Sequence, residues 1–210
     1  MKLRKFDKGV REELVETIRA LECECSAELI VAVRARSGSY RRADFLFAAV
    51  LSFVTLLFVI FSPFVFGPEW IVLDVVVSFA VGVYISTKSS TIRRLFTPEK
   101  MRNDAVRTHA AAMFYEAGIA NTEAETGVLV YLSLMERRLE LIADRGILRA
   151  VPPMEWNGTM AELHRVGRNP NPDEFIAGLK RMGGVLAQCL PPDAENPNEL
   201  SDTPYFDVEK

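Results

Sequence analysis

The carboxylates that could take part in chemistry lie in or beside the strands that the sequence predicts. Glu28 opens one apolar stretch, Glu140 lies within another, and Asp144 follows the second directly. Carboxylate oxygens are preferred ligands of Ca²⁺ and Mg²⁺, and a bound cation can polarise a phosphate or activate water. Arginine, here Arg145, can bind phosphate oxygens in a bidentate manner. The pattern predicts a metal site from Glu28, Glu140 and Asp144, with Asp144 and Arg145 as catalytic candidates.

The same residue types also allow a structural interpretation. Glu136 and Arg137 stand between two predicted strands, where Arg137 could bind phosphate or the pair could form a solvated turn. Asp144 could cap the turn before Gly146 or pair with an arginine, and we favour this structural role over a catalytic one. The sequence has no glycine-rich phosphate loop. Its three cysteines lack the spacing of a zinc site and suit a reducing compartment.

The element around which the chain is organised is a pair of long apolar runs at residues 45–87. The first run has no charged residue, and Asp74 alone interrupts the second. About 20 apolar residues in a helix cross a bilayer core of about 30 Å. Pro63, Gly67 and Pro68 break the helix between the runs. We therefore predict a transmembrane helical hairpin, since a helical pair in a soluble core would carry a polar face.

Basic residues flank this hairpin, whereas the turn between its helices carries only Glu69. They are Arg34, Arg36, Arg41 and Arg42 before it, and Lys88, Arg93, Arg94, Lys100 and Arg102 after it. Lysine and arginine near the ends of membrane helices mark the cytoplasmic side. We therefore expect a multi-pass protein of the cell (inner) membrane, with both termini and the soluble domain in the cytoplasm.

The soluble domain is expected to combine segments from both sides of the hairpin. Residues 6–21 have the periodicity of an amphipathic helix, with Asp7 as its cap, and residues 28–34 have the composition of a buried strand. One strand is not stable alone, so its partners must follow the hairpin. The predicted organisation is a first part of the domain at 1–44, the hairpin at 45–87, a second part at 88–189, and an acidic, proline-containing tail at 190–210.

The second part begins with a predicted helix at 97–117. Its buried stripe should hold Met101, Ala105, Ala112 and Met113. Residues 127–134 and 138–144 read as strands, and the short connection at 135–137 makes them an antiparallel hairpin. Helices follow at 155–166 and from Asn171 onward, the last with five apolar residues turned inward: Phe175, Ile176, Leu179, Met182 and Leu186.

Several short motifs in this part resemble the TPM-domain family. The stretch from Thr126-Gly127 to Ser133 is followed by Glu136-Arg137 and then by Ala143-Asp144-Arg145-Gly146-Ile147. Trp156 beyond them is similar to the bacterial integral-membrane branch of the family. The motif residues are Thr126, Gly127, Glu136, Arg137, Asp144 and Gly146. The resemblance implies an α/β fold, a TPM-like α/β/α sandwich around a small mixed sheet, interrupted here by the inserted two-helix hairpin.

Two functions follow as expectations. In the first, the TPM-like module is not an enzyme and binds a protein partner, in assembly or quality control at the cytoplasmic membrane face. In the second, it is a divalent-metal-dependent phosphatase, because soluble TPM relatives include acid phosphatases and some bind calcium or another divalent ion. The expected partners are the lipid bilayer and a membrane protein, and the chain could oligomerise. The net charge of −3, from 25 basic and 28 acidic residues, gives no nucleic-acid footprint.

Overall fold

The computed structural model describes residues 6–192, 200 and 203–207. The chain divides into two compact units. One comprises Met1–Ser37 and Asn103–Lys210, and the other comprises Gly38–Arg102.

The first unit is built on a four-stranded mixed sheet. Its strands are β1 (Glu28–Arg34), β2 (Gly127–Ser133), β3 (Arg138–Ala143) and β4 (Tyr205–Asp207), in the order β3-β2-β1-β4. β1 is parallel to β2 and to β4, whereas β2 and β3 are antiparallel. The predicted antiparallel hairpin is therefore confirmed, and the strand before the apolar runs does pair with a strand after them.

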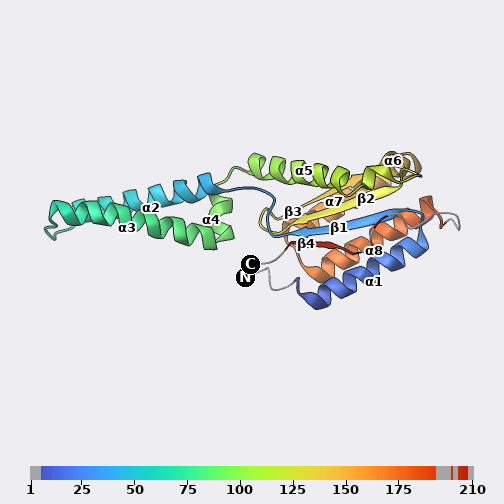
Figure 1. Ribbon diagram of the computed structural model, residues 1–210, viewed down its shortest axis with the longest axis horizontal. Helices are drawn as coiled ribbons and strands as arrows, with labels where there is room; N and C mark the ends of the chain where they lie inside the picture. Colours follow the sequence, from blue (N-terminus) through green and yellow to red (C-terminus); the bar gives the residue numbers. More distant parts are fainter. Residues whose placement is uncertain (1–5, 193–199, 201–202, 208–210) are drawn as a thin grey trace. The chain divides into compact units, whose positions relative to one another are not determined.

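Helices cover both faces of this sheet (Figure 1). One face packs against α1 (Lys8–Glu24), α7 (Pro153–Arg168) and α8 (Pro172–Cys189), and the other against α5 (Glu99–Glu116). In β1, Val31 and Val33 enter the larger core, whereas Ile30 and Ala32 enter the smaller core beneath α5. Because both faces of the strand are buried, β1 is apolar at nearly every position. The fold is α/β, and its described residues include eight α-helices, of which two are strongly apolar.

The cap of α1 and the buried face of α8 agree with the predictions from the sequence, but the buried face of α5 does not. The Asp7 carboxylate accepts the N–H of Val10 at 3.2 Å and caps α1 as expected. All five apolar residues predicted for the inner face of α8 are buried. On α5 the expected stripe is wrong, since Met101 is 51% exposed and only Met113 of the four residues is buried. The buried face is instead Val106, Ala110, Met113 and Phe114.

Three short helices were not expected from the sequence. They are α4 (Ser90–Leu95), the 3-10 turn η2 (Ile119–Asn121) and α6 (Arg145–Ala150). Gly118, which ends α5, has a φ of +73°, a left-handed conformation that glycine adopts without strain.

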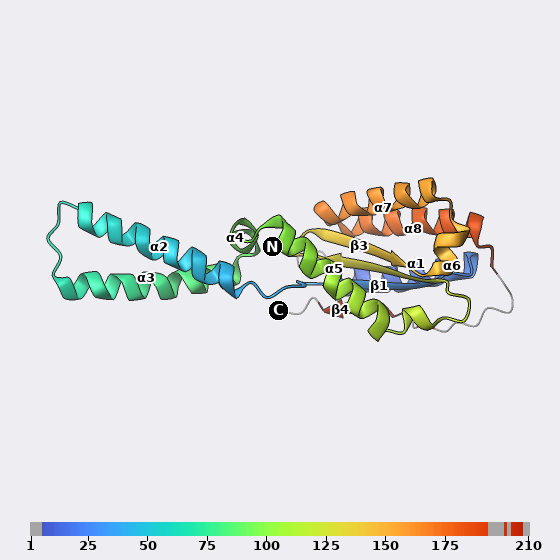
Figure 2. The same cartoon turned by 90° about the horizontal axis from the view of Figure 1, so that it is seen from above.

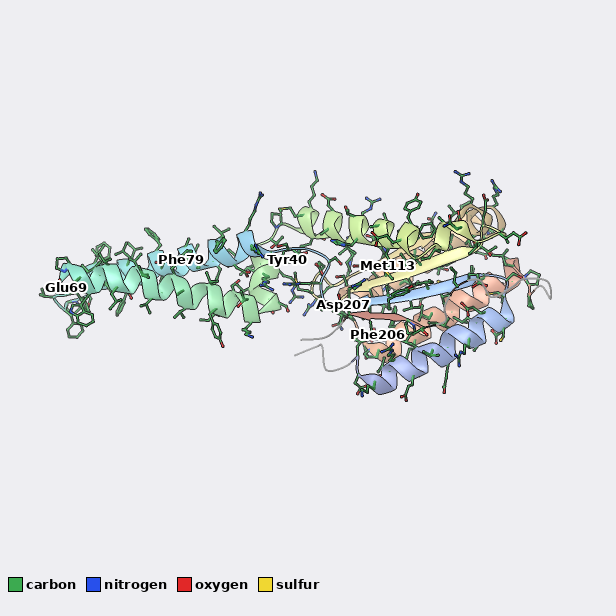
Figure 3. All side chains as sticks on the ribbon, in the orientation of Figure 1. Tyr40, Glu69, Phe79, Met113, Phe206 and Asp207 are labelled. Atoms are coloured by element: carbon green, nitrogen blue, oxygen red, sulfur yellow. The ribbon has the colours of Figure 1, made fainter. Side chains whose placement is uncertain are left out.

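The second unit is a helical hairpin of α2 (Arg41–Phe61) and α3 (Pro68–Lys88) followed by α4. Both long helices have the length and composition needed to cross a membrane. Their buried positions are mostly small or polar: Ala43, Asp44, Ala48 and Ser52 of α2, and Ser78, Gly82 and Ser86 of α3. A Cβ on Gly82 would lie 2.7 Å from Cα of Ala48, so the backbones approach closely. Large apolar side chains, including Phe79, cover the outside of the pair (Figure 3).

Candidate functional site

One end of the sheet brings together Glu28, Gly127 and Asp144. Glu28 is opposite Gly127 in the parallel register, and the Asp144 N–H donates to the Gly127 carbonyl at 2.9 Å. The Glu28 N–H donates to the carbonyl of Thr126 at 3.1 Å. Two predicted metal ligands and two motif residues therefore lie in one row across β1, β2 and the end of β3.

Asp144 is held in this row as the N-cap of α6. Its Oδ1 accepts the N–H of Arg145 at 2.7 Å. The Gly146 N–H donates to the carbonyl of Glu125 at 2.9 Å, and a Cβ on Gly146 would lie 2.6 Å from that oxygen. Only glycine fits this approach, so the Asp144-Arg145-Gly146 motif has a structural reason of the predicted kind. The Arg145 side chain is exposed.

Gly127 in the same row is also required by packing. A Cβ at that position would lie 2.4 Å from the carbonyl oxygen of Ile119, in η2. The preceding residue, Thr126, donates its N–H to Oγ1 of Thr122 at 3.2 Å. The Thr126-Gly127 motif therefore sets how closely the turn after α5 approaches the start of β2.

The oxygen atoms at this end of the sheet do not form a complete site for a divalent cation within the described residues. Asp144 Oδ2 and Thr126 Oγ1 are buried and have no hydrogen-bond partner among the described residues. Glu28 is 4% exposed, and its Oε2 accepts the N–H of Leu200 at 3.3 Å. Calcium takes six to eight oxygen ligands. Within the described ranges, no group of three or more histidine, cysteine or acidic side chains could hold a metal ion.

Glu140 does not join Glu28 and Asp144. It lies four residues before Asp144 along the chain, a separation of about 13 Å in a strand. Its Oε1 accepts Nε of Arg138 at 2.8 Å, in an ion pair whose side chains are 32% and 13% exposed. The structure therefore does not assemble the three-carboxylate set that the sequence suggested.

The opposite end of the sheet holds a buried polar cluster around Glu136. Oε1 of Glu136 accepts the N–H of Ser37 at 2.8 Å, and its Oε2 accepts the hydroxyl of Ser133. The Ser37 hydroxyl donates to Ser133 Oγ at 2.8 Å and shares a hydrogen bond of 2.9 Å with the hydroxyl of Tyr131. Burial raises the pKa of Tyr131, with the Ser37 hydrogen bond opposing that rise, so the phenol stays protonated.

This cluster corrects the interpretation of Glu136-Arg137 as a solvated turn. Residues 134–137 do form a turn, in which Arg137 has a φ of +55°, but Glu136 is only 5% exposed and is not solvated. Ser133 is fully buried, so its hydroxyl cannot meet a substrate even though it donates to a carboxylate. The cluster instead fixes the segment that leaves β1. The roles of Ser37 and Ser133 were not predicted from the sequence, although Ser133 ends β2 and Ser37 lies three residues beyond the end of β1, its parallel partner.

A buried ion pair joins α2 and α4 in the Gly38–Arg102 unit. Nε and Nη2 of Arg93 donate to the two carboxylate oxygens of Asp44, each at 2.8 Å. The hydroxyl of Ser86 donates to Oδ1 of the same carboxylate at 2.7 Å. From the sequence, Arg93 was predicted only as one of the basic residues that flank the hairpin. Asp44 was assigned to the soluble part, because α2 was expected to begin at residue 45 and begins at Arg41.

Among solved structures, this chain is similar to the NMR structure of the BA42 protein from the psychrophilic bacterium Bizionia argentinensis. The TM-score is 0.57 with 16% sequence identity, over 95% of this chain and 93% of that one. At this identity the likeness shows the fold alone. No protein-family model and no curated protein matches the sequence.

Proposed function

We propose that this chain is a membrane-anchored, TPM-like module that binds a protein partner at the cytoplasmic face of the inner membrane, in assembly or quality control of membrane proteins. The observation that supports membrane anchoring is the packing of α2 and α3, in which small residues lie between the helices and large apolar residues lie on the outside. Small residues such as Ala48 and Gly82 lie between the helices, and large side chains such as Phe58, 72% exposed, point outward. Membrane helices associate in this way because lipid already solvates their large apolar side chains.

The exposure of the two helices favours lipid over a soluble core. In the most apolar 18-residue stretch of each helix, only 17% of α2 and 11% of α3 is buried. A core helix of a soluble protein buries its apolar side against other elements. Buried serine hydroxyls at the helix pair are bonded internally: the Ser52 hydroxyl donates to the Val75 carbonyl at 2.9 Å, and the Ser78 hydroxyl donates to the same carbonyl at 3.2 Å. Internal satisfaction of this kind is what a lipid environment requires. Asp74 Oδ2 of α3 is an exception, buried without a hydrogen-bond partner among the described residues.

Cysteine labelling in spheroplasts tests the anchoring and its orientation. In a background without other cysteines, Val65→Cys places a thiol on the fully exposed turn between α2 and α3. The matched control retains only the native, exposed Cys23 on α1. A membrane-impermeant maleimide should label Val65→Cys in intact spheroplasts and Cys23 only after lysis. The proposal would be overturned if Cys23 were labelled without lysis. It would also be overturned if, after lysis, the protein were recovered in the soluble fraction and not with the membranes.

Binding rather than catalysis is supported by what the carboxylates do. Asp144 caps α6, Glu140 pairs with Arg138, Glu28 accepts a backbone N–H, and Glu136 holds the segment after β1. Each of these groups therefore has a role in holding the fold. Detergent-purified full chain should not hydrolyse p-nitrophenyl phosphate faster than its Asp144→Asn variant. Turnover that this variant loses, at an unchanged melting temperature, would replace the binding function with a phosphatase.

A divalent-metal-dependent phosphatase is the second candidate, and one observation favours it. Asp144 Oδ2 and Thr126 Oγ1 are both buried without a partner among the described residues, at the end of the sheet that also holds Glu28. A thermal-shift series with Ca²⁺, Mg²⁺, Mn²⁺ and Zn²⁺ tests it, because a ligand that binds only the folded state raises its melting temperature. Asp144→Asn is a suitable control, since asparagine also caps helices well. A shift specific to one metal and absent in the variant supports this candidate.

A further inference from the structure

The half of α3 nearer the turn carries a carboxylate, Asp74, that lacks a counter-charge. Its Oδ2 atom is shielded from solvent and has no hydrogen-bond partner among the described residues. Residues 43–87 contain no lysine, arginine or histidine, so the basic residues of the two helices are confined to the opposite end of the hairpin. At that end, Asp44 is bound by Arg93 and Ser86. An acidic side chain in a membrane helix is rare and usually pairs with another polar group, so a partner for Asp74 must come from outside the hairpin.

Asp74 lines a cavity of about 640 Å³ at the turn between α2 and α3. This turn forms the end of the hairpin farthest from α4 (Figure 2). Apolar and aromatic side chains form most of the wall: Val59, Val65, Phe66, Trp70, Leu73 and Val77. Among the described residues that line the cavity, the charged ones are Glu69 and Asp74, both acidic. The cavity therefore suits an apolar group that ends in a positive charge.

The cavity belongs to an exposed stripe along one face of α3. The stripe consists of Trp70, Leu73, Asp74, Val77, Val81 and Tyr84, which recur at the three- and four-residue spacing of a helix face. Its apolar members are exposed, from Trp70 at 61% near one end of the helix to Tyr84 at 65% near the other. Asp74 lies four residues before Ser78, which is buried between α2 and α3, so it stands at the margin of the stripe. Side chains with this spacing are those through which one helix binds another.

The depth of Asp74 favours a helix of another protein over a lipid headgroup. α3 has 21 residues and a length of about 31 Å, which matches a hydrocarbon core of about 30 Å. At about 1.5 Å per residue from Pro68, the first residue of α3, Asp74 lies about 9 Å inside the core. The amine of a lipid lies outside the core, whereas a lysine or arginine of a membrane helix can stand at the level of Asp74. A second copy of this chain has no basic residue at 43–87 and cannot supply the charge.

We propose that the stripe along α3 binds a membrane-spanning helix of the partner protein, in which a lysine or arginine in the external half of the bilayer pairs with Asp74. This inference rests on the proposed membrane anchoring and partner binding, and it names the surface and the partner chemistry. The basic side chain enters the cavity and pairs with the Asp74 carboxylate beside the ring of Trp70, where a cation–π contact adds to the attraction. Apolar side chains of the partner helix pack along Val77 and Val81.

The probe is a synthetic leucine–alanine peptide of about 21 residues, which is long enough to cross a bilayer. It carries one lysine at the depth of Asp74 and a dansyl group at the nearer end, and a matched peptide has leucine in place of the lysine. The full chain in phosphatidylcholine vesicles carries Trp156→Phe, so Trp70 alone transfers energy to the dansyl group. The lysine peptide should associate about three to ten times more tightly than the leucine peptide. Asp74→Asn should remove that difference.

Glu69→Gln is the matched control, because it removes a carboxylate from the same cavity at the exposed end of α3. Water screens a charge at this level, so the variant should change the association by less than about twofold. Asp74→Asn should not destabilise the hairpin in an SDS titration, because Oδ2 of Asp74 has no partner to lose among the described residues. Loss of peptide association in this variant is then not a loss of folding.

Three results overturn the inference. Equal association of the lysine and leucine peptides removes the site. A lysine preference that Glu69→Gln abolishes and Asp74→Asn retains places the contact at the membrane surface. Self-association of the chain that Asp74→Asn abolishes makes a second copy the occupant. Spheroplast labelling reads the anchoring separately, so equal peptide association together with labelling that supports anchoring removes this site and leaves the proposed function in place.

Discussion

The ion pair between Arg93 and Asp44 should be the main polar determinant of stability in the α2–α3 hairpin. The side chains are 14% and 6% exposed, and Arg93 binds the carboxylate with two hydrogen bonds. Arg93→Ala leaves a buried carboxylate without its counter-charge. Breaking a buried pair by removal of one partner costs about 3–5 kcal/mol. Since about 1.4 kcal/mol is a factor of ten, the equilibrium constant for unfolding of the hairpin should rise by about 10² to 10³·⁵.

The measurement is an SDS titration of the full chain in mild detergent. The chain has two tryptophans, so a Trp156→Phe background leaves Trp70 of α3 as the fluorescent reporter of the hairpin. The matched control is Arg94→Ala, which removes the same charge from the neighbouring residue of α4. Arg94 donates to Thr91 at the surface, so its loss should change the free energy of unfolding by at most about 1 kcal/mol.

A double variant separates the buried charge from the loss of packing. Asp44→Ala combined with Arg93→Ala removes both charges, and it should recover most of the stability that Arg93→Ala alone loses. The reasoning is refuted if Arg93→Ala is no more destabilising than Arg94→Ala. It is also refuted if the double variant is as unstable as the single one, because an isolated buried carboxylate is then not the cause.

Three further predictions concern packing, pH and thiol chemistry. Gly82→Leu should lower the free energy of unfolding in the same titration by about 2 kcal/mol or more, because its Cβ meets the α2 backbone, whereas outward-facing Val81→Leu should have little effect. Because burial holds the pKa of His164 below its ordinary 6.5, the unfolded state takes up the proton first. Urea unfolding should therefore show stability falling as the pH is lowered through about 6.5, the ordinary pKa of histidine, and His164→Gln should reduce that loss. Burial raises the pKa of Cys25 above 9.0, whereas Cys23 is exposed. Mass spectrometry should thus find maleimide on Cys23 under native conditions and on Cys25 only after denaturation; equal labelling would contradict the structure.

Local physical chemistry was enough to predict most of the secondary structure. The length and hydropathy of residues 41–61 and 68–88 allow little other than long helices, and the Asp7 cap and the short turn before β3 act over a few residues. The buried face of α8 followed from strong apolar periodicity. In α5, alanines and polar residues lie on every side, so periodicity could not choose between faces, and contact with the sheet selected Val106 and Phe114.

The roles of the charged residues were decided by the tertiary structure. Asp144 was predicted as a cap because its partner is the next residue in the chain. The burial of Glu136 was not predicted and no role was predicted for Asp44, because Ser37 and Arg93, which bind them, lie 99 and 49 residues away. A carboxylate's burial depends on which distant segments pack over it, and the sequence pattern around it carries no record of them. The sequence alone therefore determined where the long helices and the first three strands form, whereas tertiary packing decided β4 and which charges are buried.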